Sequence, residues 1–167
     1  MLPHGQKVDY DIITQKHLSV VVFVWDTASA TTTLVKEYHP GPNKVMLGAV
    51  AGMCENEKHT SILQAAQHEL EEEAHLRTDH WYSLLNEGAI MPFDKYSNNR
   101  FIPYLALDCE PVKSAKPLDD EEYITIHRNV TYNEMMELMA SGQINVVSTY
   151  TIMLGLKKLK DLGIKVG

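Results

Sequence analysis

The chain has 167 residues, of which 44% are hydrophobic and 22% are charged, values typical of one globular domain. Its net charge of −7 argues against nucleic-acid binding through a broad basic surface, but leaves room for a small anionic substrate held through a metal ion. The longest apolar run, at 20–25, is too short to cross a bilayer, so no membrane partner is expected. Two cysteines without metal-site spacing, and an N-terminus without a signal pattern, predict a reducing, cytoplasmic location.

The first half of the chain predicts three strands and one helix. A nearly continuous β-branched run at 18–25 predicts a buried strand, and a second strand at 32–38 completes a hairpin with it. A cluster of turn-forming residues at 39–43 separates this hairpin from a third strand at 45–50. Thr60 or Ser61 can cap the helix that follows, which we expect to end near His75.

The second half predicts more strands and then two helices. Strands are expected at 81–91, 100–107 and 123–129. Thr131 and Glu134 form a capping box that opens a helix to Ala140, and a last helix is expected over 148–162. This order predicts an α+β fold in which a mixed sheet is covered by helices on both faces (α/β/α). We expect a single domain over 1–167, with 1–17 as an N-terminal extension.

An acidic cluster stands out on the first predicted helix. Glu69, Glu72 and Glu73 have the spacing i, i+3 and i+4, so their carboxylates share one helix face and repel one another. A run of this kind is most often a solvated face. The other interpretation is a site for a hard divalent cation such as Mg²⁺, which prefers oxygen ligands.

The residues before and within this helix resemble the box motif of the Nudix hydrolases, a glycine loop followed by a glutamate-rich helix. Gly52 fits the opening glycine of the box, and the helix positions fit at Glu69, Leu70, Glu72, Glu73 and Leu76. The resemblance implies the Nudix fold and Mg²⁺-dependent hydrolysis, with Mn²⁺ as a substitute. It also implies metal ligation by the three glutamates together with a main-chain oxygen of Ala51 or Gly52.

The chain departs from the box at four points. His68 replaces the arginine, His75 replaces the late glycine, and the loop is two residues longer than the pattern allows. The early glutamate of the box therefore falls on Thr60 or Lys58. In the family, this glutamate and the arginine form an ion pair that braces the loop. Here both partners are missing, and Glu55 or Glu57 is an alternative partner for His68.

Other positions resemble the ADP-ribose pyrophosphatase branch of the family. Pro92 lies sixteen residues after Leu76, as in that branch. This implies an ADP-sugar substrate, such as ADP-ribose hydrolysed to AMP and ribose 5-phosphate, and is compatible with a homodimer. Substrate contacts are expected at Tyr38, His39, Pro92 and Phe93, and the general base at Glu121 or Glu122.

One alternative function accompanies this interpretation, and one kind of metal site is excluded. The departures from the box are also compatible with a nucleotide-binding or regulatory module that has weak or no hydrolase activity. A zinc site is not expected, because the motif that begins at His68-Glu69 has Glu72 where the second histidine belongs.

Overall fold

The structure, a computed structural model, describes residues 4–113 and 123–166. The elements, in chain order, are β1 (Leu18–Trp25), β2 (Thr31–His39), β3 (Lys44–Gly48), β4 (Val50–Cys54), α1 (Ile62–Ala74), β5 (Leu76–Arg77), β6 (Trp81–Ser83), β7 (Met91–Pro92), β8 (Arg100–Leu107), β9 (Glu110–Pro111), β10 (Ile124–Thr131), α2 (Tyr132–Ala140) and α3 (Val146–Asp161). Within the described ranges, no helix has the length and apolar content that a membrane crossing requires.

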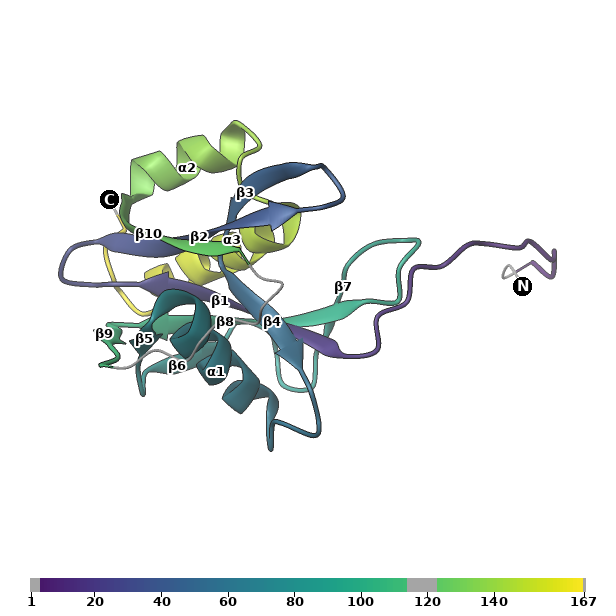
Figure 1. The fold of residues 1–167 in the computed structure, drawn as a ribbon, viewed down its shortest axis with the longest axis horizontal. Coiled ribbons are helices and arrows are strands. Elements are labelled where there is room, and N and C mark those ends of the chain that lie inside the picture. Colours follow the sequence, from purple (N-terminus) through teal and green to yellow (C-terminus); the bar gives the residue numbers. More distant parts are fainter. Residues whose placement is uncertain (1–3, 114–122, 167) are drawn as a thin grey trace.

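The strands form one mixed sheet and two antiparallel ones (Figure 1). In the mixed sheet the order is β4-β1-β8-β6, and β7 also pairs with β8. The β1 and β8 strands run parallel, whereas β4, β6 and β7 are antiparallel to their neighbours. A second sheet has the order β10-β2-β3, and β5 pairs with β9. Gly52 therefore lies in an edge strand, β4, which pairs with the buried strand β1, and α1 follows this strand.

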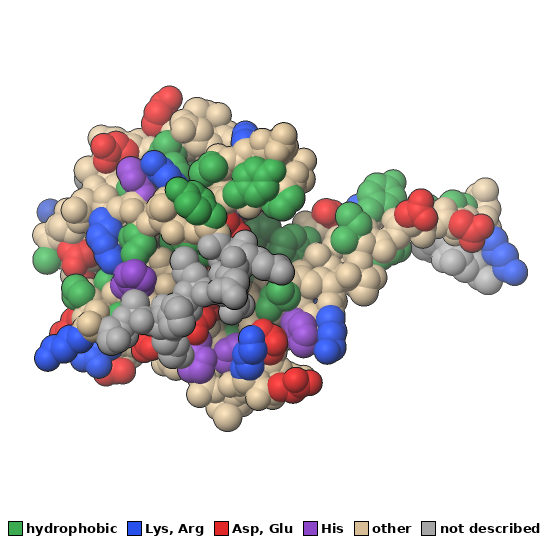
Figure 2. All heavy atoms as spheres, in the orientation of Figure 1, with side chains coloured by type: hydrophobic (Ala, Val, Ile, Leu, Met, Phe, Trp, Pro, Cys, Tyr) green, Lys and Arg blue, Asp and Glu red, His purple; other side chains and the backbone are tan. Residues whose placement is uncertain are grey.

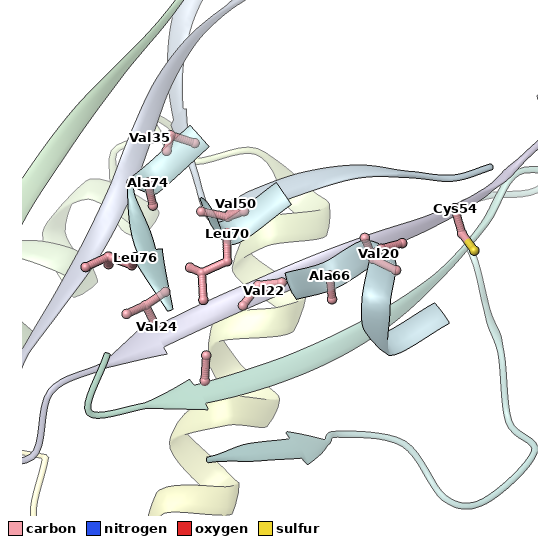
Figure 3. Packing of buried hydrophobic residues seen from close by; sticks show 12 residues of the cluster. Val20, Val22, Val24, Val35, Val50, Cys54, Ala66, Leu70, Ala74 and Leu76 are labelled. Atoms are coloured by element: carbon pink, nitrogen blue, oxygen red, sulfur yellow. The ribbon is translucent and has the colours of Figure 1, made fainter. Parts of the chain in front are cut away.

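The central strand β1 is buried on both faces, which is why its sequence is almost continuously apolar. Val20, Val22 and Val24 belong to the core cluster that contains Leu70 and Ala74 of α1 (Figure 3). The alternate side chains Phe23 and Trp25 pack in a second cluster with Ile152 and Leu159 of α3. Helices thus cover both faces of the mixed sheet, which confirms the predicted α+β layered fold.

Two predicted strands are wrong in their extent. The strand expected at 81–91 is interrupted, because the Ala89 amide donates to the Asn86 carbonyl and Gly88 has a φ of 75° in the turn between β6 and β7. The strand expected at 45–50 is divided between two sheets. It breaks at Ala49, whose amide donates to the Ser148 hydroxyl instead of to a strand.

The predicted last helix also begins earlier than expected, at Val146, because the Asn145 side chain accepts the Ser148 amide and acts as the N-cap.

The first described residues form an arm that projects from the body of the molecule (Figure 1). At its base, the Ile13 amide donates to the Tyr96 carbonyl, so the arm pairs with the segment that follows β7. Figure 2 shows hydrophobic side chains along the projecting arm. Val8, Tyr10 and Ile12, at alternate positions, are all exposed.

Candidate active site

The helix α1 carries the acidic cluster and is fixed at its start by a cap. The Ser61 hydroxyl accepts the Gln64 amide, and the Gln64 side chain in turn accepts the amide and hydroxyl of Thr60. The first bond satisfies an amide that the first helical turn leaves without a partner, and the others tie the residue before the N-cap to the helix. Thr60, one of the two positions for the early glutamate of the box, is therefore engaged in capping.

Glu73 links α1 to β4. Its side chain is 5% exposed, and its carboxylate accepts the Ala51 amide at 3.0 Å. A buried carboxylate is costly unless hydrogen bonds compensate for the lost water, so this bond helps to fix where the carboxylate lies. The second residue of the Glu-Glu pair is therefore directed at Ala51, which precedes Gly52 in β4.

Glu69 lies over the neighbouring residue of the same strand. A Cβ atom added to Gly52 would come well within 3.0 Å of the Glu69 carboxylate, closer than real Cβ atoms approach other atoms. Gly52 is thus required for close approach, since its φ is not in the left-handed region. Two carboxylates one helical turn apart contact two consecutive residues of β4, Ala51 and Gly52.

The end of α1 explains one departure from the box. His75 has a φ of 54°, in the left-handed region, and its amide donates to the Leu70 carbonyl. Glycine adopts this conformation without strain, whereas other residues do so at a cost of about 1 kcal/mol. The Arg128 guanidinium of β10 donates to the Ala74 carbonyl at 2.8 Å, so this carbonyl in the last turn of α1 has a hydrogen-bond partner. His75 therefore ends α1 in the left-handed conformation that glycine adopts without strain.

The loop between β4 and α1 differs from the braced loop of the family. The Glu55 carboxylate pairs with Lys58 at 2.8 Å, and this hydrogen bond holds the pKa of the carboxyl below its ordinary value. The His68 ring lies 5.0 Å from the His59 ring, centroid to centroid, in an edge-to-face arrangement. The structure thus brings the rings of His59 and His68 together. An ion pair of His68 with Glu55 or Glu57 stays a prediction.

The donor chemistry fits a hard cation. Carboxylates of Glu69, Glu72 and Glu73, and the main chain at Ala51 and Gly52, are oxygen donors. In the part of the chain that the structure describes, no three His, Cys, Asp or Glu side chains converge into a preformed metal site. Mg²⁺ does not need such a cage, because it keeps several waters and binds through one or two carboxylates and the phosphates of its substrate. Glu121 and Glu122, the predicted bases, lie outside the described residues.

A cleft of about 350 Å³ adjoins this site. Ala51 and Gly52 line it, as do two predicted substrate contacts, His39 and Phe93. The other two do not: the Tyr38 hydroxyl donates to Asn43 in the β2–β3 turn, and Pro92 lies exposed in β7. Sequence reasoning missed the start of α3, which also lines the cleft; Asn145 followed by Ser148 is a capping signal that marks it.

A larger cleft, of about 600 Å³, lies on another side of α1. Glu71, Arg77 and Trp81 line it. Glu69, Glu72 and Glu73 line neither cleft, but the wall of the smaller cleft includes Ala51 and Gly52, the two β4 residues that Glu73 and Glu69 contact. The smaller cleft is therefore the better candidate for the chemistry.

Comparison with protein families agrees with this geometry. The NUDIX domain model matches residues 15–150, which is most of the chain. The protein therefore belongs to the Nudix family, the class of pyrophosphohydrolases that the box motif indicated.

A crystal structure described as that of an ADP compounds hydrolase superposes with a TM-score of 0.69. The alignment has 21% sequence identity and covers 87% of this chain and 75% of that one. Because 153 chains of known structure match, the fold alone does not select a substrate. No curated protein sequence gives a significant match.

Proposed function

We propose that this Nudix enzyme hydrolyses the pyrophosphate bond of a nucleoside diphosphate derivative in a Mg²⁺-dependent reaction. ADP-ribose or another ADP-sugar is the preferred substrate class, giving AMP and a sugar phosphate. One observation carries the proposal: Glu69 and Glu73, one turn apart on α1, contact consecutive residues of β4 beside a cleft. The name of the structural relative, an ADP compounds hydrolase, supports the substrate class.

The reaction requires charge neutralisation and a positioned water. Bound Mg²⁺ would neutralise the phosphates and lower the pKa of a bound water. Glu69, Glu72 and Glu73, with a main-chain oxygen of Ala51 or Gly52, would hold it. Water attacks one phosphorus, the bridging P–O bond breaks, and the proton of the water passes to a base that we place at Glu121 or Glu122. His39 and Phe93 on the cleft would contact the nucleoside, through a polar ring and an aromatic face.

The substrate is tested with a panel of nucleoside diphosphate compounds. We expect cleavage of ADP-sugars at millimolar Mg²⁺ or Mn²⁺, with AMP identified by chromatography. Glu73→Gln is the informative variant, because glutamine keeps an oxygen that can accept the Ala51 amide but removes the charge. Binding of these nucleotides by calorimetry without turnover would contradict the proposal and favour the binding or regulatory module.

We also propose that the protein is a cytoplasmic homodimer. Tyr10, Ile12 and Ile13 on the projecting arm are 48%, 49% and 68% exposed, and large apolar side chains grouped in this way mark protein interfaces. The free thiols of Cys54 and Cys109 suit a reducing compartment. Sedimentation equilibrium tests the dimer, which we expect to dissociate in the Tyr10→Ser, Ile12→Ser double variant. A wild-type protein that sediments as a monomer would contradict it.

A further inference from the structure

The loop that joins β4 to α1 folds on itself before it reaches the helix. The amides of Lys58 and His59 both donate to the Glu55 carbonyl, at 3.0 and 2.9 Å. The Lys58 ammonium closes the same turn from the side, at 2.8 Å from the Glu55 carboxylate. Residues 55–59 therefore form a compact turn directly after the last residue of β4.

This turn orients the His59 ring. The Glu55 amide donates to Nδ1 of His59 at 3.1 Å, so the bond assigns Nδ1 as the acceptor and, in the neutral ring, Nε2 as the protonated nitrogen. A ring whose nitrogen is held by a main-chain amide has little rotational freedom. His59 is thereby presented in a fixed direction from the turn.

The oriented ring meets α1 at His68. The two ring centroids are 5.0 Å apart with an interplanar angle of 61°, the edge-to-face geometry that aromatic pairs prefer. His68 immediately precedes Glu69, whose carboxylate lies over Gly52 of β4. Two sets of contacts thus connect β4 to α1. One runs through the turn and the histidine pair, and the other is the approach of Glu69 to Gly52.

We propose that His59 is a positioning residue of the active site: by packing on His68 it sets how α1 presents Glu69 to Gly52. The proposal rests on the metal-dependent function proposed above. It accounts for the paired departures from the box, since the longer loop supplies His59 and the arginine position supplies the ring that receives it. The positioning role predicts a defect in metal affinity more than in folding.

Two substitutions separate the contacts of His59. His59→Phe keeps a ring to pack on His68 but loses the acceptor for the Glu55 amide, whereas His59→Asn offers an acceptor close to the position of Nδ1 but cannot reach His68. Exposed His80, outside this loop, gives the control His80→Ala. For each variant, circular dichroism monitors folding, and electron paramagnetic resonance gives the dissociation constant of Mn²⁺.

We expect His59→Asn to weaken Mn²⁺ binding by about tenfold, as for other residues that orient metal ligands, with kcat recovered at saturating metal. His80→Ala should stay within about twofold of the wild type. His59→Phe should fall between the wild type and His59→Asn, because it keeps the ring contact but loses the amide bond that orients the ring. His59→Asn should add nothing in a His68→Ala background, because the ring contact is already lost. Unchanged Mn²⁺ binding in His59→Asn, or effects of His59→Asn and His68→Ala that multiply, would overturn the proposal.

A further measurement separates failure of this inference from failure of the proposed function. If the wild type neither binds Mn²⁺ nor cleaves nucleotides, the metal-dependent function fails. Amide hydrogen exchange then decides for His59: faster exchange over residues 52–59 in both His59→Asn and His68→Ala supports a ring contact that holds the loop. Exchange identical to that of the wild type overturns it.

Discussion

Replacing Gly52 by alanine tests the close approach of Glu69 to β4. The added Cβ would lie well within 3.0 Å of the Glu69 carboxylate, whereas ordinary contacts begin near 3.4 Å. The carboxylate must therefore retreat by on the order of 1 Å, and displacements of this size cost about 100-fold in rate when they affect a reacting group. The cost in stability is small, because the displaced atoms are the end of a flexible, partly exposed side chain.

The assay compares kcat/KM and thermal stability in the same preparation. We expect Gly52→Ala to lose about 100-fold in kcat/KM for the best substrate of the nucleotide panel, while Tm falls by no more than about 3 °C. Gly41→Ala is the matched control, since a Cβ there meets no atom within 4 Å. In the Glu69→Gln background, Gly52→Ala should add little, because both substitutions disable the same carboxylate.

Activity of Gly52→Ala within about threefold of the wild type would refute this reasoning. A Tm loss of about 10 °C or more would also refute it, since the glycine would then serve folding instead of the placement of Glu69.

Three further predictions concern parts of the fold that support the site. Gly155→Ala should lower the free energy of unfolding by about 2 kcal/mol and Tm by about 6 °C. The reason is that the added Cβ would overlap the buried Phe23 ring, and an unchanged melting curve would contradict this packing. His75→Gly should raise Tm by about 2 °C by relieving the left-handed strain at the end of α1, and a lower Tm would contradict that account. Burial, aided by the charges of Asp108 and Asp26, raises the pKa of the Cys109 thiol to about 12. The folded state therefore favours the neutral thiol, so the free energy of unfolding should fall as pH rises from 9 towards 12. In Cys109→Ala this fall should be less steep. Denaturant titrations that give the same pH dependence for both proteins would contradict this.

The local signals in the sequence were sufficient where one segment determines its own structure. The β-branched run of β1 and the capping box at Thr131 both give the predicted elements, because burial and end-capping depend on neighbouring residues. The predicted strand at 45–50 failed for the opposite reason. Its break at Ala49 depends on Ser148, a residue 99 positions away, which no local pattern reveals.

The candidate site shows the same division. The spacing of Glu69, Glu72 and Glu73 placed them on one helix and favoured Glu69 and Glu73, which are one turn apart. It could not show that Glu73 is buried and accepts the Ala51 amide of β4. The pairing of His59 with His68 likewise requires the loop to close back on the helix, which no local pattern in the sequence reveals. Sequence reasoning thus gave most of the elements, but not the contacts between elements, such as the bond of Ala49 to Ser148 that divides a predicted strand.

The central claim is that the carboxylates facing β4 support metal-dependent cleavage of a pyrophosphate bond. The most direct test is a Mg²⁺ titration of hydrolysis for the wild type, Glu69→Gln, Glu73→Gln and the control Glu71→Gln, whose residue lines the larger cleft. We expect the wild type and Glu71→Gln to respond alike, and Glu69→Gln and Glu73→Gln each to lose at least about 100-fold at every Mg²⁺ concentration. Full activity in both site variants, or hydrolysis that persists unchanged in excess chelator, would contradict the claim.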